Sequence, residues 1–215
     1  MFSKFTTFMK REITIEQIET IDNFSETLPL HTISVVNWNL FPYAPQASFR
    51  IAYTREELCI KFYVTEKHVK GSYLKDNEPV CNDSCVEFFV RPQGSEYYYN
   101  FEFNPIGTLL AAKRVTRANA IRFNDDELSR ITRIPSLGRA PINLSDKLTS
   151  WTLFVTIPFD LLGCCEIPSE LQANLYKCGD QTQQPHYLSW SPIYCEQPNF
   201  HTPNMFGTIY TMASK

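Results

Sequence analysis

Acidic and amide residues alternate with aromatic ones in two neighbouring stretches, and they are the residues of this chain best suited to hold a polar ligand. Glu87 lies in SCVEFFV (84–90), and Asn100, Glu102 and Asn104 lie in YYYNFEFN (97–104). Carboxylates accept hydrogen bonds, and carboxamides both donate and accept them. Two carboxylates brought together repel each other, so a cation, an Arg, a shared proton or a polar ligand must offset them.

The spacing of these stretches predicts a β-hairpin, with turn chemistry at 92–95 (PQGS). In the second strand the aromatic residues at 97, 99, 101 and 103 point one way, and the residues at 98, 100, 102 and 104 point the other. We expect the aromatic face to meet the core and the polar face to be open to solvent or to a ligand. If the strands pair, Glu87 and Glu102 share the polar face.

Short alternating segments separated by Pro, Gly and Asn recur along the whole chain. They predict further strands at 33–38, 48–54, 58–65, 108–114, 151–157, 171–177, 187–190 and 206–212, and one helical turn opening at 124–127. The segment 13–22 fits either a short helix or an edge strand. This pattern indicates an all-β protein, an antiparallel β-sandwich or jelly-roll-like domain. We expect one domain over 1–215, with 1–31 as an N-terminal extension packed on it.

Composition narrows the function classes. The formal net charge of −3 argues against a nucleic-acid partner, and the Arg-rich stretch 114–139 is balanced by acids, which favours a solvated edge or an ion-paired strand. No apolar run approaches the ~20 residues that span a bilayer, so no membrane partner is expected. Seven cysteines, an odd number, with no signal-peptide pattern favour free thiols in the cytoplasm. A periplasmic location requires a signal removed before Met1.

Cysteine and histidine spacing gives weak support for a metal site, and the identity of any metal stays open. Cys178, His186, Cys195 and His201 are a conceivable zinc set, but their spacing fits no standard finger. Buried free cysteines are the better interpretation.

Several segments resemble family-9 carbohydrate-binding modules. They are DSCVEFF (83–89), YYYNFEFN (97–104), SW (189–190) and the closing FG (206–207). The chain is more similar still to stand-alone family-9-like proteins of Bacteroidetes-type bacteria, through NLYKCGD (174–180), PHYLSW (185–190) and PNFHTPNMFG (198–207). The resemblance covers about 38–210, and the order and spacing of the segments make it specific.

The resemblance implies a β-sandwich related to the DOMON-type fold and a non-catalytic role in carbohydrate catabolism. Characterised modules hold the reducing end of a glucan or xylan between two tryptophans, and they hold structural calcium. By position, Glu87 takes the acidic role, Glu102 a polar role and Phe200 one aromatic wall. The other wall falls near Val80 or Cys81, which are not aromatic; Tyr73, Trp38 and Trp190 are candidate replacements. No EF-hand-type loop accompanies the carboxylates.

We therefore expect a saccharide ligand, a small saccharide or glycan end, on a polar sheet face with an aromatic rim. The expected binding residues are Glu87, Glu102, Asn100, Asn104, Tyr176, Phe200 and His201. Structural alternatives stand beside them: Phe200 as an inward-packing loop anchor, the two glutamates as ion-pair partners of Arg, and His186 as a hydrogen-bonded structural residue. Trp151 and Trp190 are predicted to be core residues.

Two other functions remain open. The first is a glycosidase with Glu87 and Glu102 as its acid and base, which requires carboxyl groups ~5–10 Å apart flanking a cleft. The second is a haem or small-ligand carrier, which requires an axial His or Met pair on the sandwich, whereas His186 and His201 lie in predicted loops. The sequence leaves the oligomeric state open.

Overall fold

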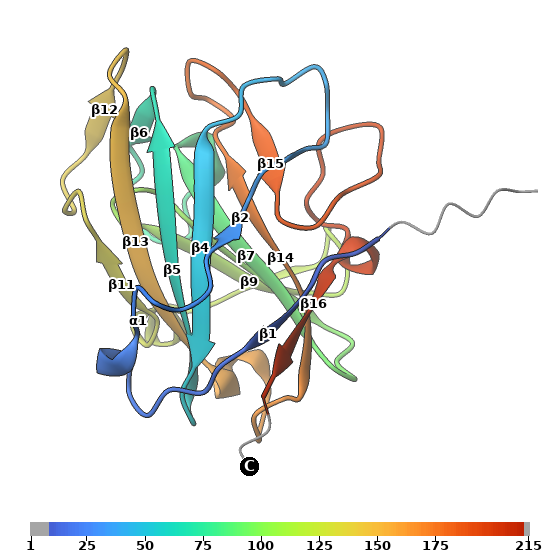
Figure 1. Ribbon diagram of the computed structural model, residues 1–215. Helices are drawn as coiled ribbons and strands as arrows, with labels where there is room; N and C mark the ends of the chain where they lie inside the picture. The colour runs from blue at the N-terminus through green and yellow to red at the C-terminus, as the bar shows by residue number, and fades with distance from the viewer. Residues whose placement is uncertain (1–8, 213–215) are drawn as a thin grey trace, which may run out of the picture.

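Two packed β-sheets form the molecule in the computed structural model, which describes residues 9–212 (Figure 1). One sheet, sheet A, has the strand order β1-β16-β14-β7-β8-β9-β10, with β15 and β3 attached beyond β14; the other, sheet B, has the order β11-β13-β5-β4-β2. The pairing is antiparallel except between β1 and β16. This all-β sandwich is the predicted fold.

The bounds of the elements are as follows. Sheet A contains β1 (Glu12–Ile15), β3 (Val35–Val36), β7 (Cys85–Pro92), β8 (Tyr98–Phe103), β9 (Leu109–Arg114), β10 (Ala120–Arg122), β14 (Glu170–Cys178), β15 (Tyr187–Ser189) and β16 (Gly207–Thr211). Sheet B contains β2 (His31–Thr32), β4 (Gln46–Tyr53), β5 (Glu57–Glu66), β11 (Thr132–Pro135) and β13 (Thr149–Pro158). A separate pair joins β6 (Val69–Gly71) to β12 (Ile142–Leu144), and the one α-helix in residues 9–212 is α1 (Asp125–Ser129).

The core lies between the two sheets. The side chains of Tyr99, Phe101 and Phe103 enter it from β8, as the alternation predicted, and Phe49 and Phe62 face them from sheet B. Trp151 and Trp190 are also buried there, as predicted. Because side chains alternate across a strand, placing these rings in the core sends Tyr98, Asn100 and Glu102 to the outer face of sheet A.

The predicted hairpins are confirmed, whereas several short strands were missed. β4 pairs with β5 in one hairpin, and β7 pairs with β8 in the other across a turn with Gly94 at φ 76°. The strand predicted for 33–38 is confirmed only at β3, which joins sheet A; β2, just before it, joins sheet B, so the chain crosses between the sheets there. β6 and β12 lie outside the segments predicted as strands. β10 and β11 lie in the Arg-rich stretch 114–139, where a solvated edge or an ion-paired strand was expected, and Arg133 of β11 does pair with Asp76.

The predicted N-terminal extension, 1–31, contributes directly to the sandwich. Residues 12–15 form an edge strand beside β16, and a short 3-10 helix spans Ile21–Asn23. Residues 1–8 lie outside the described part of the chain. Gly207 of β16 is needed because a Cβ there would meet the Arg11 carbonyl oxygen at 2.5 Å and the Trp190 ring at 2.6 Å.

The expectation that the outer face of sheet A is open is wrong over most of its area. A second apolar cluster covers it, built from strand residues such as Phe89, Tyr98 and Tyr176 and from Phe200 and Phe206 of the C-terminal segment. The segments 37–45 and 179–206, blue and orange-red in Figure 1, close over this side of the sheet. The reason is that apolar side chains of these two segments pack onto the outer face of the sheet, and the alternation within the strands does not reveal this contact.

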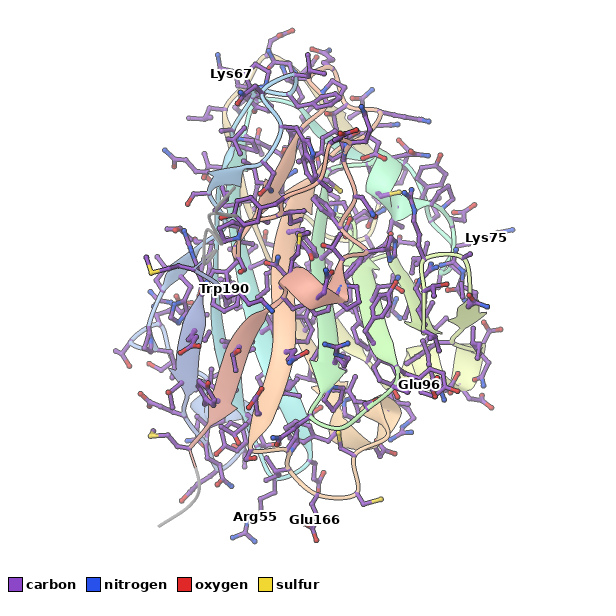
Figure 2. All side chains as sticks on the ribbon, turned by 90° about the vertical axis from the view of Figure 1, so that its right-hand side faces the viewer. Arg55, Lys67, Lys75, Glu96, Glu166 and Trp190 are labelled. Carbon is purple, nitrogen blue, oxygen red and sulfur yellow. The ribbon has the colours of Figure 1, made fainter. Side chains whose placement is uncertain are left out.

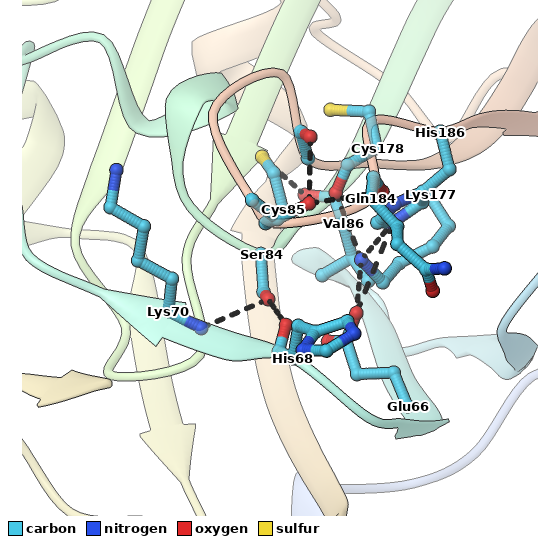
Figure 3. A network of polar contacts seen from close by, with 12 residues as sticks. Glu66, His68, Lys70, Ser84, Cys85, Val86, Lys177, Cys178, Gln184 and His186 are labelled. Atoms are coloured by element: carbon cyan, nitrogen blue, oxygen red, sulfur yellow. Dashed lines mark hydrogen bonds and ion pairs between the residues drawn. The ribbon is translucent and has the colours of Figure 1, made fainter. Parts of the chain in front are cut away.

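A buried polar network joins the two sheets at one end of the sandwich (Figure 3). Lys177 Nζ of β14 lies 3.0 Å from Glu66 Oε2 of β5 and 2.7 Å from His186 Nε2, and the side chains of all three are fully buried. Trp151 Nε1 donates to Glu66 Oε1 at 2.9 Å. His186 Nδ1 faces the Gln184 carbonyl oxygen at 2.8 Å, so it carries the proton, and Nε2 accepts from Lys177. His186 thus has the structural role predicted for it.

Figure 2 shows how far the strands extend: Lys67, just beyond β5, lies at the top, whereas Arg55 and Glu166 lie at the bottom. Within residues 9–212, no helix has the length and apolarity needed to cross a bilayer.

Candidate functional site

A pocket opens on the outer face of sheet A, where the covering segments leave a gap over β7, β8 and β14. Its volume is about 120 Å³. Its lining includes four of the predicted residues, Glu87, Glu102, Phe200 and His201, together with Cys81, Phe89, Arg117, Cys178, Asp180, Tyr187, Pro198 and Asn199. Typical drug-sized ligands occupy ~300–1,000 Å³, so this pocket suits one small ring or end group.

Glu87 and Glu102 form the carboxylate pair of the pocket. They stand directly opposite each other in the β7/β8 register and are only 3% and 6% exposed. Burial, and then the neighbouring Glu102 carboxylate, raise the pKa of Glu87 well above its usual value. Burial raises the pKa of Glu102 to about 7, against the opposing effect of Arg122 and Arg114. A buried pair of this kind holds a proton or requires a cation or hydroxyl partner.

Asn100 positions Glu102 within the sheet. Its Nδ2 donates to Glu102 Oε1 at 3.0 Å, and its Oδ1 accepts from Arg114 Nε at 2.6 Å. Asn100 is fully buried and does not line the pocket. Its place is therefore behind the carboxylate, where the Arg114–Asn100 contact fixes which way the amide points.

Tyr176 and Phe200 form a stacked pair beside the pocket. Their ring centroids are 4.0 Å apart with an interplanar angle of 6°, and the Tyr176 hydroxyl donates to the Phe200 carbonyl oxygen at 3.1 Å. Phe200 is 9% exposed and Tyr176 is fully buried. Phe200 therefore anchors its loop to β14, as in the structural alternative considered for it, and it also borders the pocket.

Tyr187 is the pocket aromatic that the sequence did not reveal, although it lies in the PHYLSW segment. The centroid of its ring lies 6.1 Å from that of Phe200, with an interplanar angle of 71°, and its side chain is hydrogen-bonded to Asp180. Trp38 packs against both rings, with ring-centroid distances of 6.2 Å to Tyr187 and 6.1 Å to Phe200. Tyr187 and Phe200 thus meet edge to face, and they do not form two parallel walls.

The other proposed replacements for the missing wall lie elsewhere. Trp190 belongs to the core between the sheets, and the Tyr73 hydroxyl accepts a hydrogen bond from Asn82 Nδ2 at 3.1 Å. Cys81, at the family position of that wall, does line the pocket, while Val80 is fully buried.

His201 and Arg117 border the pocket as basic residues of different kinds. His201 Nδ1 lies 3.0 Å from the Tyr98 hydroxyl, and burial together with Arg114, Arg117 and Arg122 lowers the pKa of His201 to about 3. His201 is therefore neutral at pH 7 and acts as a hydrogen-bonding group. The exposed Arg117 supplies the positive charge, and no sequence pattern singled it out.

Asn104 lies outside the pocket lining, although strand parity grouped it with Glu102. Its Nδ2 donates to the Tyr73 carbonyl oxygen at 2.9 Å and to Asp83 Oδ2 at 3.1 Å. Its Oδ1 accepts from the backbone N–H of Thr108 at 2.9 Å. These contacts connect the 72–83 segment to the β8/β9 turn.

The potential metal ligands that meet in residues 9–212 differ from the set considered from the sequence. They are Cys85, Glu87 and Cys178, whose ligand atoms lie within 4.8 Å of one another. Cys178 Sγ donates to Glu87 Oε1 at 3.0 Å. This group offers one carboxylate, whereas Ca²⁺ takes 6–8 oxygen ligands, so it does not fit the structural calcium that the resemblance implied.

The pocket supports polar recognition better than the two other functions considered. The carboxylates are buried side by side in the wall of a small pocket, and they do not flank an open cleft as a glycosidase pair would. The volume of about 120 Å³ is too small for haem.

The comparisons with known proteins agree with this geometry. A putative carbohydrate-binding protein from Bacteroides uniformis ATCC 8492 has a structure similar to this one, with 33% sequence identity, a TM-score of 0.88, and coverage of 95% of this chain and 100% of that chain. A family-9 carbohydrate-binding module from Caldicellulosiruptor kristjanssonii in complex with cellotriose shares the fold, with a TM-score of 0.60, 10% identity and 95% of both chains covered.

A family-9 carbohydrate-binding module from Caldicellulosiruptor kristjanssonii in complex with glucose gives a TM-score of 0.55 at 10% identity, with 95% of this chain and 97% of that chain covered. No curated protein matches the sequence. The family model described as carbohydrate-binding family 9 matches residues 17–211, nearly the whole chain. Together with the sandwich and its small polar pocket, this match shows that the chain belongs to carbohydrate-binding family 9.

Proposed function

We propose that this protein binds a small saccharide or a glycan end in the pocket on sheet A, without catalysis, in the service of carbohydrate catabolism. One observation carries the proposal: Glu87 and Glu102 are buried side by side in a pocket that joins these paired carboxylates to aromatic rings. A sugar ring donates hydroxyl hydrogen bonds to carboxylates and packs its C–H groups against aromatic rings, so a sugar site needs both kinds of group.

Each pocket residue has a distinct role in this proposal. Glu87 and Glu102 accept hydrogen bonds from sugar hydroxyls, and Arg117 donates to sugar oxygens from the rim. Tyr187 and Phe200 contact the apolar edge of the ring. Because these two rings meet edge to face, the saccharide inserts its end into the pocket and is not held between parallel aromatic plates.

The test is a glycan array followed by titration calorimetry on the saccharides that bind. Glu87→Gln should weaken binding about tenfold or more, because a hydrogen bond to a charged acceptor is worth ~1.5–3 kcal/mol. Arg117→Ala, at an exposed position, should weaken binding without altering the fold. Glu96→Gln is the matched control, since Glu96 is exposed in the β7/β8 turn and outside the pocket lining (Figure 2).

Two results would count against the proposal. One is the absence of any saccharide ligand. The other is a saccharide whose affinity is the same for Glu87→Gln, Arg117→Ala and the Glu96→Gln control, which would place the binding site elsewhere.

The proposed location is the cytoplasm, and the cysteines support it. All seven are unpaired in the structure, and thiols of this number persist in a reducing compartment. Thiol counting on the denatured, non-reduced protein from its native source should find close to seven; a protein with mostly disulfides would contradict the cytoplasmic location.

A further inference from the structure

The base of the saccharide pocket contains a cluster of soft and hard metal ligands. Cys85 and Cys178 face each other across the β7/β14 pairing, and Glu87 follows two residues after Cys85 on the same face. Their ligand atoms lie within 4.8 Å of one another, and the residues are 0%, 1% and 3% exposed. We propose that Cys85, Cys178 and Glu87 bind one zinc ion at the base of this pocket.

The strand register explains why three ligands converge. Residues i and i+2 of a strand share a face, which places Cys85 beside Glu87. Directly opposed residues on antiparallel strands have Cβ atoms ~4.5–5.5 Å apart, which places Cys178 beside Cys85. The three ligands therefore come from two adjacent strands, near the start of β7 and the end of β14, and the ion requires no loop to fold around it.

The donor set selects the metal. Two thiolates and one carboxylate match the ligands of tetrahedral Zn²⁺, with Zn–S distances of ~2.3 Å and Zn–O distances of ~2.0–2.2 Å. Two such ligands of one tetrahedral ion lie ~3.6 Å apart at these bond lengths, so Cys178 Sγ and Glu87 Oε1, now 3.0 Å apart, need only separate slightly to admit the ion. Soft thiolates disfavour Mg²⁺ and Ca²⁺, which take oxygen ligands.

The site has an entry path and an open coordination position. Glu87 and Cys178 line the pocket, whereas Cys85 lies behind them, so an ion reaches the cluster from the pocket side. Asp180 and Glu102 also line the pocket and attract a cation. The fourth position faces the pocket and holds water, the arrangement of a zinc site that can exchange a ligand.

Binding is balanced by proton release. Cys85 and Cys178 each lose a thiol proton, and any proton that Glu87 shares with Glu102 is also released to solvent, as the three zinc bonds form. In the metal-free protein the Cys178 thiol donates to Glu87, and this hydrogen bond is replaced by coordination of both groups to one ion.

The experiment uses the reduced, full-length protein and metal alone, with no saccharide present. Co²⁺ replaces Zn²⁺ as an optical probe, because tetrahedral cobalt bound by thiolates shows a sulfur-to-metal charge-transfer band together with visible ligand-field bands. We expect these bands to saturate at one Co²⁺ per chain and to disappear when Zn²⁺, the stronger competitor, is added. Mg²⁺ and Ca²⁺ should leave them unchanged.

Variants assign the ligands. Cys178→Ser and Cys85→Ser should each weaken binding by about 100-fold or more, while Glu87→Gln should weaken it but keep the charge-transfer band, because both thiolates remain. Cys164→Ser is the matched control, since Cys164 is a half-buried thiol outside the pocket. It should bind as the parent does.

A second measurement needs no substitution and so does not depend on whether a variant folds. Zn²⁺ should protect Cys85 and Cys178 from a thiol-alkylating reagent, with the protected residues identified by mass spectrometry. A reduced protein without the charge-transfer band, a band that survives Cys178→Ser, or zinc protection of other cysteines would each overturn the proposal. None of these results would bear on saccharide binding, which is measured separately.

Discussion

Glu87 and Glu102 stand directly opposite each other on β7 and β8, both almost completely buried. Like charges in this relation destabilise a sheet. Arg114 and Arg122 partly offset the charge of Glu102, whereas Glu87 accepts a hydrogen bond from the Cys178 thiol. The pair therefore carries a cost to stability that a binding role explains.

Replacing one carboxylate should stabilise the protein while weakening saccharide binding. Glu102→Gln removes the repulsion and keeps an amide oxygen to accept from Asn100 Nδ2. We expect a higher midpoint of thermal unfolding than that of the parent at pH 7.5 in the presence of a chelator, together with a lower affinity for the saccharide. A variant that melts earlier and binds normally would show that Glu102 is a structural residue.

The Lys177–Glu66 ion pair should be the most sensitive polar contact between the sheets. Lys177→Met leaves the Glu66 carboxylate buried with the Trp151 N–H as its remaining partner, and breaking a buried pair in this way costs about 3–5 kcal/mol. Urea unfolding measures this loss of free energy.

The double variant Lys177→Met with Glu66→Gln is the control for that prediction. It removes the buried charge and retains an acceptor for Trp151, so most of the lost stability should return. If the double variant were as unstable as Lys177→Met alone, shape and not charge would account for the loss.

Phe200→Ala should affect both folding and binding. The substitution removes a ring stacked on Tyr176 at 4.0 Å and leaves a cavity, with a cost of about 3 kcal/mol. Phe200→Leu should recover much of the stability but not the full contact with the sugar. Comparing the two variants by urea unfolding and by calorimetry separates the anchoring role from the binding role; equal stability of the parent and Phe200→Ala would contradict the stacked anchor.

Acid should destabilise the protein in part through His201. Its pKa is lowered to about 3 by burial and by Arg114, Arg117 and Arg122, whereas an unfolded histidine has a pKa near 6.5. Below pH ~6.5 the unfolded state binds the proton that the folded state resists, so stability is full above pH ~6.5 and falls as the pH drops toward 3.

The matched variant is His201→Asn, whose side-chain oxygen can accept from the Tyr98 hydroxyl. Its free energy of unfolding should fall less steeply between pH 6.5 and 4 than that of the parent, by up to ~1.4 kcal/mol per pH unit. Parallel curves for the two proteins over this range would show that His201 is protonated equally in the folded and unfolded states.

Much of the fold follows from the sequence because side-chain alternation is local. The period of two over 97–104 fixed which residues enter the core, and it required Glu87 and Glu102 to share a face once their strands paired. Prolines and glycines marked the turns for the same reason, since their backbone restrictions act within a few residues. The short strands β10, β11 and β12 carry too little apolar alternation to be recognised before their partners are known.

The candidate site was only partly predictable because it depends on contacts between distant segments. Strand parity grouped Asn104 with Glu102, but Asn104 bonds to Asp83 and the backbone of Tyr73, and Asn100 supports Glu102 from behind. Arg117 comes to the pocket from the connection between β9 and β10, whereas Asp180 and Tyr187 come from the segment 179–206 after β14.

The sequence by itself determined the sandwich, its core face and the shared face of Glu87 and Glu102 once their strands pair. Only the tertiary structure decided that the polar face would be covered, that one small pocket would remain over the carboxylates, and that Cys178 would lie against Glu87. The physical reason is that alternation acts between neighbours along one strand, whereas burial and pocket shape depend on other segments, many of them distant in the sequence, packing onto that strand.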